Sequence, residues 1–319
     1  MTLLSVQDLS VGFFIENEFA LAVRDVSFSV KKGEILCLVG ESGCGKTVTS
    51  LSILRLIPPN GRIVEGRILF KGKDLCKLSE EQMRDIRGKE ISMIFQEPLT
   101  SLNPVFTIKD QIAEAIMVHE NASKQEITDR CITLLKEVGI SEPEKRLYDY
   151  PHQLSGGQRQ RVMIAIALAC NPSLIIADEP TTALDVTVQA QILTLFKELQ
   201  EKYNISLLYI THDLSVVAQI ADRVCVMYAG IIVEEGSVEH IFYSPAHPYT
   251  KGLLDSLPKR HFKNQKLKSI PGFVPDLLSR PKGCPFHPRC PLTEKLCTEA
   301  IPDFKELEDG HRIRCHILG

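Results

Sequence analysis

The chain reads Gly40-Glu-Ser-Gly-Cys-Gly-Lys-Thr47 at the point that decides its fold. The stretch fits the pattern G-x-x-x-x-G-K-S/T, in which glycines let backbone N–H groups approach phosphate oxygens without interference from a Cβ atom. Lys46 can neutralise charge on the β- and γ-phosphates, and Thr47 offers a hydroxyl to Mg²⁺. The alternative is a glycine-rich turn with a surface lysine. We interpret the stretch as a phosphate-binding loop because the sequence predicts a strand before it and a helix after it.

Alternating strands and helices surround this loop. Residues 34–39 form an apolar run that predicts a buried strand, and residues 46–57 have a helical pattern closed by Pro58 and Pro59. Helical patterns such as residues 188–203 follow further along the chain. Three more apolar runs are typical of buried parallel strands, namely 174–177, 207–210 and 224–228. Strands that alternate with helices predict a parallel α/β sheet.

Three other regions flank this core in the sequence. Residues 3–9 and 22–30 alternate apolar and polar side chains, which predicts two short strands separated by a turn around 16–18. Residues 107–170 have a largely helical pattern, and after residue 257 the periodicity fades while prolines and cysteines become frequent. We therefore expect three parts: a nucleotide-binding domain over 1–257, a helical subdomain within it at about 97–170, and a C-terminal element over 258–319.

The composition excludes several classes of protein. Hydrophobic residues make up 44% of the 319 residues and charged residues 24%, a balance typical of a soluble globular chain. The longest apolar run, residues 162–170, is far shorter than the roughly 20 residues that span a bilayer, and residues 1–10 lack the pattern of a signal peptide. The net charge of −3 provides no basic excess for nucleic acid. One basic run is interpreted as a solvated linker, namely Lys259, Arg260, Lys263, Lys266 and Lys268.

Two carboxylates end one of the predicted strands, in the stretch Leu174-Ile-Ile-Ala-Asp-Glu179. Because ligands of α/β sheets bind at the carboxyl ends of strands, we expect both carboxylates near the phosphates. Asp178 is the candidate acceptor for Mg²⁺, and Glu179 is the candidate base that polarises an attacking water. Taken alone, such a pair would be interpreted as an exposed turn or a helix cap.

A second glycine loop identifies the family. Leu154-Ser-Gly-Gly-Gln158 precedes a helical pattern at 159–170, where Ser155 is placed to cap the helix and the glycines expose N–H groups to an anion. The loop resembles the signature loop of ABC ATPases. The full set of motifs lies in ABC order: the phosphate loop, Gln96, the signature loop, Asp178-Glu179, Ala183-Leu-Asp185 and His212. The resemblance implies an α/β fold with a P-loop NTPase (RecA-like) core, an N-terminal antiparallel β subdomain, an inserted helical subdomain and a small cysteine-containing C-terminal element.

The resemblance also implies a role for each matching residue. Gln96 resembles the Q-loop glutamine, which contacts Mg²⁺ and the attacking water, and Asp185 resembles the D-loop aspartate, which links paired sites. His212 resembles the switch histidine, which contacts the γ-phosphate. The expected catalytic residues are Glu179, His212 and Gln96. The expected Mg²⁺ ligands are Thr47, Gln96 and Asp178.

The resemblance calls for an aromatic side chain near the N-terminus that stacks on adenine. Phe13 is our choice, with Phe14 and Phe19 as rivals. The residues expected to bind ATP are Phe13, Gly40, Glu41, Ser42, Gly43, Cys44, Gly45, Lys46, Thr47, Val48, Gln96, Ser155, Gly156, Gly157, Gln158, Asp178 and Asp185.

A single chain holds one phosphate loop and one signature loop. In ABC ATPases two domains pack head to tail, so that ATP lies between the phosphate loop of one domain and the signature loop of the other. The resemblance therefore implies a second ATPase subunit, in a heterodimer or, for the isolated chain, a homodimer. Hydrolysis then opens and closes the pair.

Several stretches resemble the oligopeptide/dipeptide/nickel importer branch of the family, namely residues 97–104, 150–154, 178–185, 247–250, 272–275 and 283–291. In that branch two ATPase subunits pair beneath two transmembrane permease subunits at the cytoplasmic face of the inner membrane, and an extracytoplasmic binding protein delivers the substrate. Residues 96–106 are expected to receive the permease. We expect an ATP hydrolase that energises uptake of di- or oligopeptides. The alternatives are nickel import, a soluble ABC ATPase without transport, and an Fe–S redox protein.

The chain has ten cysteines, which in a reducing compartment bind metal more often than they form disulfides. Four of them follow the spacing C-x5-C-x6-C-x17-C: Cys284, Cys290, Cys297 and Cys315. Relatives in the branch carry a 4Fe–4S cluster here, and four thiolates suit one. Structural Zn²⁺ and unligated thiols remain open, and His287, His311 or His316 could substitute in a mixed site. Cys44 is interpreted as a small packing residue rather than an oxidation-sensitive thiol.

Overall fold

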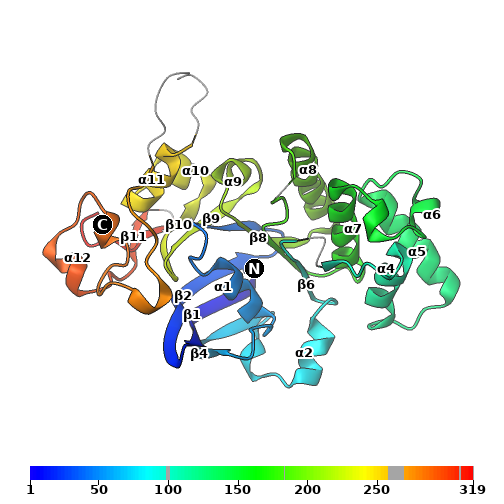
Figure 1. Ribbon diagram of the computed structural model, residues 1–319, viewed down its shortest axis with the longest axis horizontal. Helices are drawn as coiled ribbons and strands as arrows, with labels where there is room; N and C mark the ends of the chain where they lie inside the picture. The colour runs from blue at the N-terminus through cyan, green and yellow to red at the C-terminus, as the bar shows by residue number, and fades with distance from the viewer. Residues whose placement is uncertain (98–100, 183, 258–268, 309, 319) are drawn as a thin grey trace. The chain divides into compact units, whose positions relative to one another are not determined.

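The computed structural model describes residues 1–97, 101–182, 184–257, 269–308 and 310–318. They form two units: Met1–Cys76 with Ile210–Gly319 in unit 1, and Lys77–Tyr209 in unit 2. Figure 1 labels many of their helices and strands. The basic run at 259–268 and Ala183 lie outside the described residues. The domain boundary at residue 257 stays a prediction, since the segment that follows it also lies outside them.

An antiparallel sheet in unit 1 contains both predicted N-terminal strands. Strands β1 (Thr2–Ile15) and β2 (Glu18–Lys31) pair with β4 (Gly61–Phe70) and β5 (Lys73–Asp74) in the order β2-β1-β4-β5. Glu16 and Asn17 form the turn between β1 and β2, both with positive φ, which suits a two-residue hairpin. The two strands and the turn are confirmed, and both strands are longer than predicted.

The second sheet of unit 1 contains the strand that leads into the phosphate loop. All five residues of β3 (Ile35–Val39) are buried, and β3 pairs in parallel with β9 (Arg223–Tyr228). Beyond β9 the pairing is antiparallel, through β10 (Ile231–Ser237), β12 (His311–Ile313) and β11 (Lys305–Glu308). The buried strands are confirmed, but this part of the sheet is mixed, because a tight turn joins β9 directly to β10.

Helix α1 (Lys46–Ile53) begins where the sequence predicts and ends four residues earlier. Its end is set by Arg55, which has a φ of 53°. The N–H of Leu56 donates to the carbonyl oxygen of Leu51 at 2.8 Å, which closes the helix in a wide terminal turn. The sequence pattern predicts a helix that reaches Pro58, but the left-handed backbone of Arg55 ends the helix one turn sooner.

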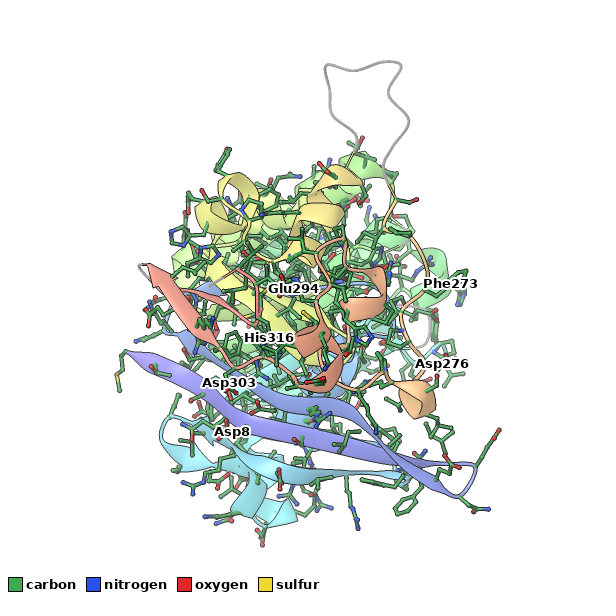
Figure 2. All side chains as sticks on the ribbon, turned by 90° about the vertical axis from the view of Figure 1, so that its left-hand side faces the viewer. Asp8, Phe273, Asp276, Glu294, Asp303 and His316 are labelled. Atoms are coloured by element: carbon green, nitrogen blue, oxygen red, sulfur yellow. The ribbon has the colours of Figure 1, made fainter. Side chains whose placement is uncertain are left out.

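The remaining elements of unit 1 follow strand β8 (Ser206–Thr211), which crosses the division between the units. They include α9 (Leu214–Ile220), α10 (Val238–Tyr243) and α11 (Pro248–Asp255). The C-terminal part consists of the single turns η3 (Leu277–Ser279) and η4 (His287–Arg289), α12 (Lys295–Glu299) and strands β11 and β12. Figure 2 looks onto this part, where Phe273, Asp276, Glu294 and His316 are labelled.

Unit 2 is largely helical, as the sequence predicts for residues 107–170. Its helices are α2 (Glu80–Ile86), α4 (Ile108–Met117), α5 (Lys124–Glu137), α6 (Pro143–Arg146), α7 (Gly156–Leu168) and α8 (Val186–Tyr203). Capping boxes start α4, α5 and α7, because Thr107, Ser123 and Ser155 each accept from the backbone N–H three residues on. Strands β6 (Ile91–Ile94) and β7 (Leu174–Asp178) pair in parallel. In the part of the chain that the structure describes, no helix is both long and apolar enough to cross a membrane.

Candidate nucleotide-binding and hydrolysis site

The phosphate loop joins β3 to α1 in unit 1, and two of its glycines are required by geometry. A Cβ atom on Gly40 would lie 2.1 Å from the carbonyl oxygen of Met227, so no larger residue fits there. Gly45 caps α1 with a φ of 107°, a conformation that residues with a side chain rarely adopt. The conformation of the loop therefore depends on glycine at both positions.

Lys46 is buried at 5% exposure inside the loop that precedes it. Its Nζ donates to the carbonyl oxygens of Gly40 at 2.8 Å and Glu41 at 3.1 Å. These contacts hold the ammonium group within its own loop, while the side chains of Ser42 and Thr47 are exposed. The arrangement presents a fixed positive charge and a hydroxyl, as phosphate and Mg²⁺ require.

Cys44 is fully buried in the same loop. Its carbonyl oxygen accepts from the N–H of Gly230 at 2.8 Å, and burial raises the pKa of its thiol. Because oxidation proceeds through the thiolate, burial of this kind protects the sulfur. The structure supports the interpretation of Cys44 as a packing residue.

Two residues that the sequence did not single out contact the loop. The hydroxyl of Tyr249 accepts from the N–H of Glu41 at 2.9 Å, and Arg289 forms an ion pair with the Glu41 carboxylate. Both lie more than 200 positions from Glu41. No local pattern could have revealed these contacts.

His212 lies directly after strand β8, in unit 1. The side chain is exposed, between the buried Thr211 and Asp213, whose carboxylate caps α9 by accepting from the N–H of Ser215 at 2.8 Å. The hydroxyl of Thr211 accepts from the N–H of Asp213 at 3.0 Å. A strand end and a capped helix thus fix the backbone on both sides of the histidine.

The candidate adenine-binding aromatics lie at the β1–β2 hairpin. A Cβ atom on Gly61 would lie 2.4 Å from the Phe13 ring, so this ring packs directly over Gly61 on β4. Phe14 and Phe19 pair with their ring centroids 5.0 Å apart, and both are partly exposed. The choice of Phe13 stays a prediction, because all three rings lie at one hairpin.

The carboxylate pair and Gln96 lie in unit 2, at the ends of two parallel strands. Ile94 of β6 is in register with Ala177 of β7, so the residues after both strands meet at one edge of the sheet. Gln96 Nε2 donates to Glu179 Oε2 at 3.2 Å. The structure thus brings together two residues 83 positions apart that the sequence assigned to one catalytic site.

Glu179 differs from Asp178 in both burial and backbone geometry. Asp178 is 2% exposed at the end of β7, whereas Glu179 is partly exposed and has a φ of 46°, in the left-handed region. The hydroxyl of Thr182 also donates to Glu179 Oε2, at 3.1 Å. A strained backbone and two side-chain donors therefore fix the direction of this carboxylate.

The signature loop, also in unit 2, begins helix α7. Ser155 Oγ accepts from the N–H of Gln158 at 3.3 Å, and Gln158 Oε1 accepts from the N–H of Ser155 at 3.0 Å, which confirms the predicted cap. A Cβ atom on Gly157 would lie 2.7 Å from a methyl group of Val188 on α8. Asp185 caps α8 by accepting from the N–H of Val188 at 2.9 Å, so the signature and D-loop motifs meet at this helix.

The four late cysteines all lie in the C-terminal part of unit 1. Three are buried, and the N–H of Cys284 donates to the carbonyl oxygen of Cys297 at 2.9 Å. Burial, with smaller contributions from the three neighbouring thiols, raises the pKa of Cys284 to about 11. Among the described residues, however, no group of three or more His, Cys, Asp or Glu side chains is placed to hold a metal ion.

The neighbouring histidines make other contacts. His287 Nδ1 lies 2.9 Å from the carbonyl oxygen of Cys284, and His316 Nε2 lies 2.9 Å from that of Ala300. His311 Nε2 lies 2.8 Å from a carboxylate oxygen of the fully buried Glu234. The imidazoles therefore contribute hydrogen bonds to the fold of this region.

A phosphate loop between a buried strand and a helix, with a carboxylate pair at the end of another strand, defines the class of P-loop nucleoside triphosphatases. The family model described as ABC transporter matches residues 23–182, and the model described as oligopeptide/dipeptide transporter, C-terminal region, matches residues 233–297. The chain belongs to the ABC transporter family. It is an ATPase of that family, and the expected fold class is confirmed.

The chain is similar over nearly its whole length to curated relatives. It is 54% identical to the dipeptide transport ATP-binding protein DppD of Bacillus subtilis, over 98% of this chain and 93% of that one. It is 51% identical to the protein of the same name in Escherichia coli (99% and 97%), and 52% identical to the oligopeptide transport ATP-binding protein OppD of B. subtilis (99% and 89%).

Solved structures give the same fold. A dimeric, post-hydrolysis ATP-binding cassette bound to ADP and Pi is 28% identical, with a TM-score of 0.67, over 74% of this chain and 98% of that one. The CbiO1 protein of Clostridium perfringens, part of a CbiONQ transporter complex, is 27% identical, with a TM-score of 0.66, over 76% and 91%.

Proposed function

We propose that this chain is the ATP-hydrolysing subunit of an ABC importer that takes up di- or oligopeptides. The observation that carries the proposal is the match of residues 233–297 to the C-terminal region of oligopeptide/dipeptide transporters. Relatives that are 51–54% identical, and that are named for dipeptide or oligopeptide transport, support the same cargo.

Glu179 is the proposed general base. Its carboxylate accepts from Gln96 and Thr182, which hold it in one orientation at the strand end. A carboxylate so held takes a proton from the water that attacks the γ-phosphate, while Gln96 orients that water. In unit 1, Lys46 neutralises phosphate charge and His212 contacts the γ-phosphate. The signature residues Ser155–Gln158 act on the ATP of a neighbouring ATPase subunit.

The donor atoms present suit Mg²⁺, which prefers oxygen ligands. Thr47 would contribute a hydroxyl, Gln96 an amide oxygen and Asp178 a carboxylate that β7 holds in a buried position. When bound, Mg²⁺ neutralises charge on the phosphates. The proposed adenine platform is Phe13, at the hairpin of β1 and β2.

The proposed partners follow from the same function. They are a second ATPase subunit, two transmembrane permease subunits that dock at residues 96–106, and an extracytoplasmic binding protein. A dimeric state of a structurally similar cassette supports the pairing. The proposed location is the cytoplasmic face of the inner membrane, where the chain would bind peripherally. Residues 98–100 of the docking stretch lie outside the described residues.

Uptake by a deletion strain tests this function and its cargo. The strain is complemented with the wild-type gene, with Glu179→Gln, or with Glu198→Gln, a matched substitution at an exposed position of α8. Labelled dipeptide, labelled oligopeptide and nickel are offered separately. We expect the wild type and Glu198→Gln to restore peptide uptake and Glu179→Gln to restore none. Restoration of nickel uptake alone would overturn the peptide assignment in favour of the nickel importers of the branch.

The four late cysteines are proposed as ligands of a 4Fe–4S cluster, with Zn²⁺ as the alternative. Support comes from their common place in the C-terminal part of unit 1 and from the hydrogen bond of 2.9 Å between the N–H of Cys284 and the carbonyl oxygen of Cys297. Four thiolates can hold either group, and the present side-chain positions would have to converge to do so. Anaerobic purification followed by iron, sulfide and zinc analysis tests this. Stoichiometric zinc without iron would exclude the cluster, and protein free of both would exclude a metal site.

A further inference from the structure

Glu41, within the phosphate loop, is held at both its backbone and its side chain by residues from the C-terminal third of the chain. Its N–H donates to the hydroxyl of Tyr249 at 2.9 Å. Its carboxylate accepts from both terminal nitrogens of Arg289, at 2.7 Å and 3.1 Å. Paired contacts of this kind are among the strongest and most directional that a carboxylate makes. All three residues belong to unit 1.

All three nitrogens of the Arg289 guanidinium group donate hydrogen bonds. Besides Glu41, Nε donates to the carbonyl oxygen of Pro271 at 2.9 Å, and the terminal nitrogens reach the Tyr228 hydroxyl at 3.3 Å and the Ile270 carbonyl at 3.4 Å. The Arg289 side chain is only 5% exposed. Its orientation is therefore determined before the loop meets any ligand.

Three buried aromatic rings support these contacts. Tyr228 from β9, Tyr249 from α11 and Phe286 from the C-terminal part have ring centroids 4.6 to 5.3 Å apart, and each is at most 2% exposed. Close packing of this kind prevents either tyrosine ring from turning. The Tyr249 hydroxyl that accepts from Glu41 is thus held in place by the C-terminal part of the chain.

The charge on Glu41 has a consequence for phosphate binding. The loop offers backbone N–H groups and Lys46 to a polyanion, and a carboxylate in the same loop repels that polyanion unless a cation neutralises it. Arg289 supplies that cation. Lys46 also donates to the carbonyl oxygen of Glu41, so a change in the position of Glu41 reaches the lysine directly.

We propose that Arg289 and Tyr249 are positioning residues through which the C-terminal part of the chain sets the affinity of the phosphate loop for ATP. Arg289 neutralises Glu41, and Tyr249 fixes its backbone. Neither touches ATP; both act through Glu41. The inference rests on the proposed role of the loop in binding ATP, so the test includes a variant of that loop.

The first experiment measures the Kd of the purified full-length chain for MgATP and MgADP by calorimetric titration. Arg289→Ala should weaken ATP binding by about 10-fold, because it leaves an unneutralised carboxylate in the loop. The loss should be smaller for ADP, which carries less charge. Arg312→Ala is the matched control, since Arg312 lies in the same C-terminal part and pairs with Glu235 rather than with the loop. It should bind ATP as the wild type does.

The second experiment separates charge neutralisation from structural damage. The double variant Glu41→Gln/Arg289→Ala lacks both charges and should recover most of the affinity that Arg289→Ala loses. A merely structural arginine would not be rescued by removing its carboxylate partner. Tyr249→Phe, which keeps the ring and removes the acceptor of the Glu41 N–H, should weaken ATP binding by about threefold. It provides an independent test if Arg289→Ala fails to fold.

The outcomes are distinguishable from failure of the proposed function. If Lys46→Ala weakens ATP binding by about 100-fold while Arg289→Ala and Tyr249→Phe bind ATP like the wild type, only this inference is overturned. Absence of rescue in the double variant would also overturn it. If Lys46→Ala binds ATP normally, the role of the loop itself is wrong.

Discussion

Two glycine loops begin helices in this molecule, one in each unit, and they treat the first turn of the helix differently. In the described part of the chain no side chain caps α1, which follows Gly45, whereas Ser155 and Gln158 form a reciprocal capping box at the start of α7. The first N–H groups of a helix need partners. At α7 the protein itself provides these partners. At α1 the backbone can offer its first N–H groups to phosphate. The comparison indicates that the signature loop is shaped by its own side chains, whereas the phosphate loop offers a ligand backbone N–H groups together with the Lys46 ammonium.

The largest expected effect concerns the phosphate loop. Lys46→Ala removes the buried ammonium that the Gly40 and Glu41 carbonyls hold, and ATP affinity should fall about 100-fold, or about 2.7 kcal/mol. Titration with MgATP measures the change. The corresponding change beside the signature loop, Arg159→Ala, should leave the ATP affinity of the isolated chain within threefold. Equal losses would show that the two loops do not differ in the way proposed.

A second prediction concerns the shape of the phosphate loop. Gly40→Ala places a Cβ atom 2.1 Å from the Met227 carbonyl oxygen, which forces β3 and β9 apart. We expect a loss of about 2 kcal/mol in the free energy of unfolding, measured in urea. Gly72→Ala is the control, because Gly72 has a φ of 79° but nothing within 4 Å of the added atom. Its loss should be about 1 kcal/mol, from backbone conformation alone.

Helix α11 begins with a cap that titrates, His247. His247 Nδ1 accepts from the N–H of Tyr249 at 3.1 Å, and burial lowers the pKa of this histidine to about 3. The unfolded chain, with an ordinary histidine pKa near 6.5, binds a proton that the folded chain does not. The contribution of His247 is therefore fully present above pH 6.5 and is lost as the pH falls towards 3. We expect about 1.3 kcal/mol less stability at pH 5.5 than at pH 7 from this residue.

The variant His247→Asn isolates this contribution, because asparagine caps a helix without titrating in this range. Urea unfolding at both pH values should show a smaller pH dependence for the variant than for the wild type. An unchanged dependence would assign the effect to other groups.

The smallest expected effect concerns the signature loop, whose Ser155 caps helix α7. Ser155→Ala and Ser123→Ala each remove the serine of a capping box, and each should cost about 1 kcal/mol of stability. Only Ser155→Ala should also lower ATP turnover, since α5 carries no proposed site residue. Steady-state ATPase and thermal unfolding of both variants measure the two effects. A matching loss of turnover in Ser123→Ala would assign the effect to stability alone.

Sequence reasoning succeeded where chemistry depends on neighbouring residues. The phosphate loop, the cap at Ser155 and the buried strand before Asp178 are local features, and each lies where the pattern predicts. The end of α1 was misjudged, because the left-handed backbone of Arg55 has no signal in the hydrophobic pattern. The antiparallel pairing of β9 with β10 was missed for a similar reason, since a run of buried residues does not specify strand direction.

By itself the sequence determined the family, the order of the motifs and the strand–loop–helix arrangement around Lys46. These follow from glycine spacing, helix caps and strand ends, which act over a few residues. Only the tertiary structure decided that Arg289 and Tyr249 hold Glu41 and that Gln96 and Thr182 hold Glu179. Most of these contacts join residues tens to hundreds of positions apart. Their geometry depends on strand register and ring packing, which a linear pattern does not contain.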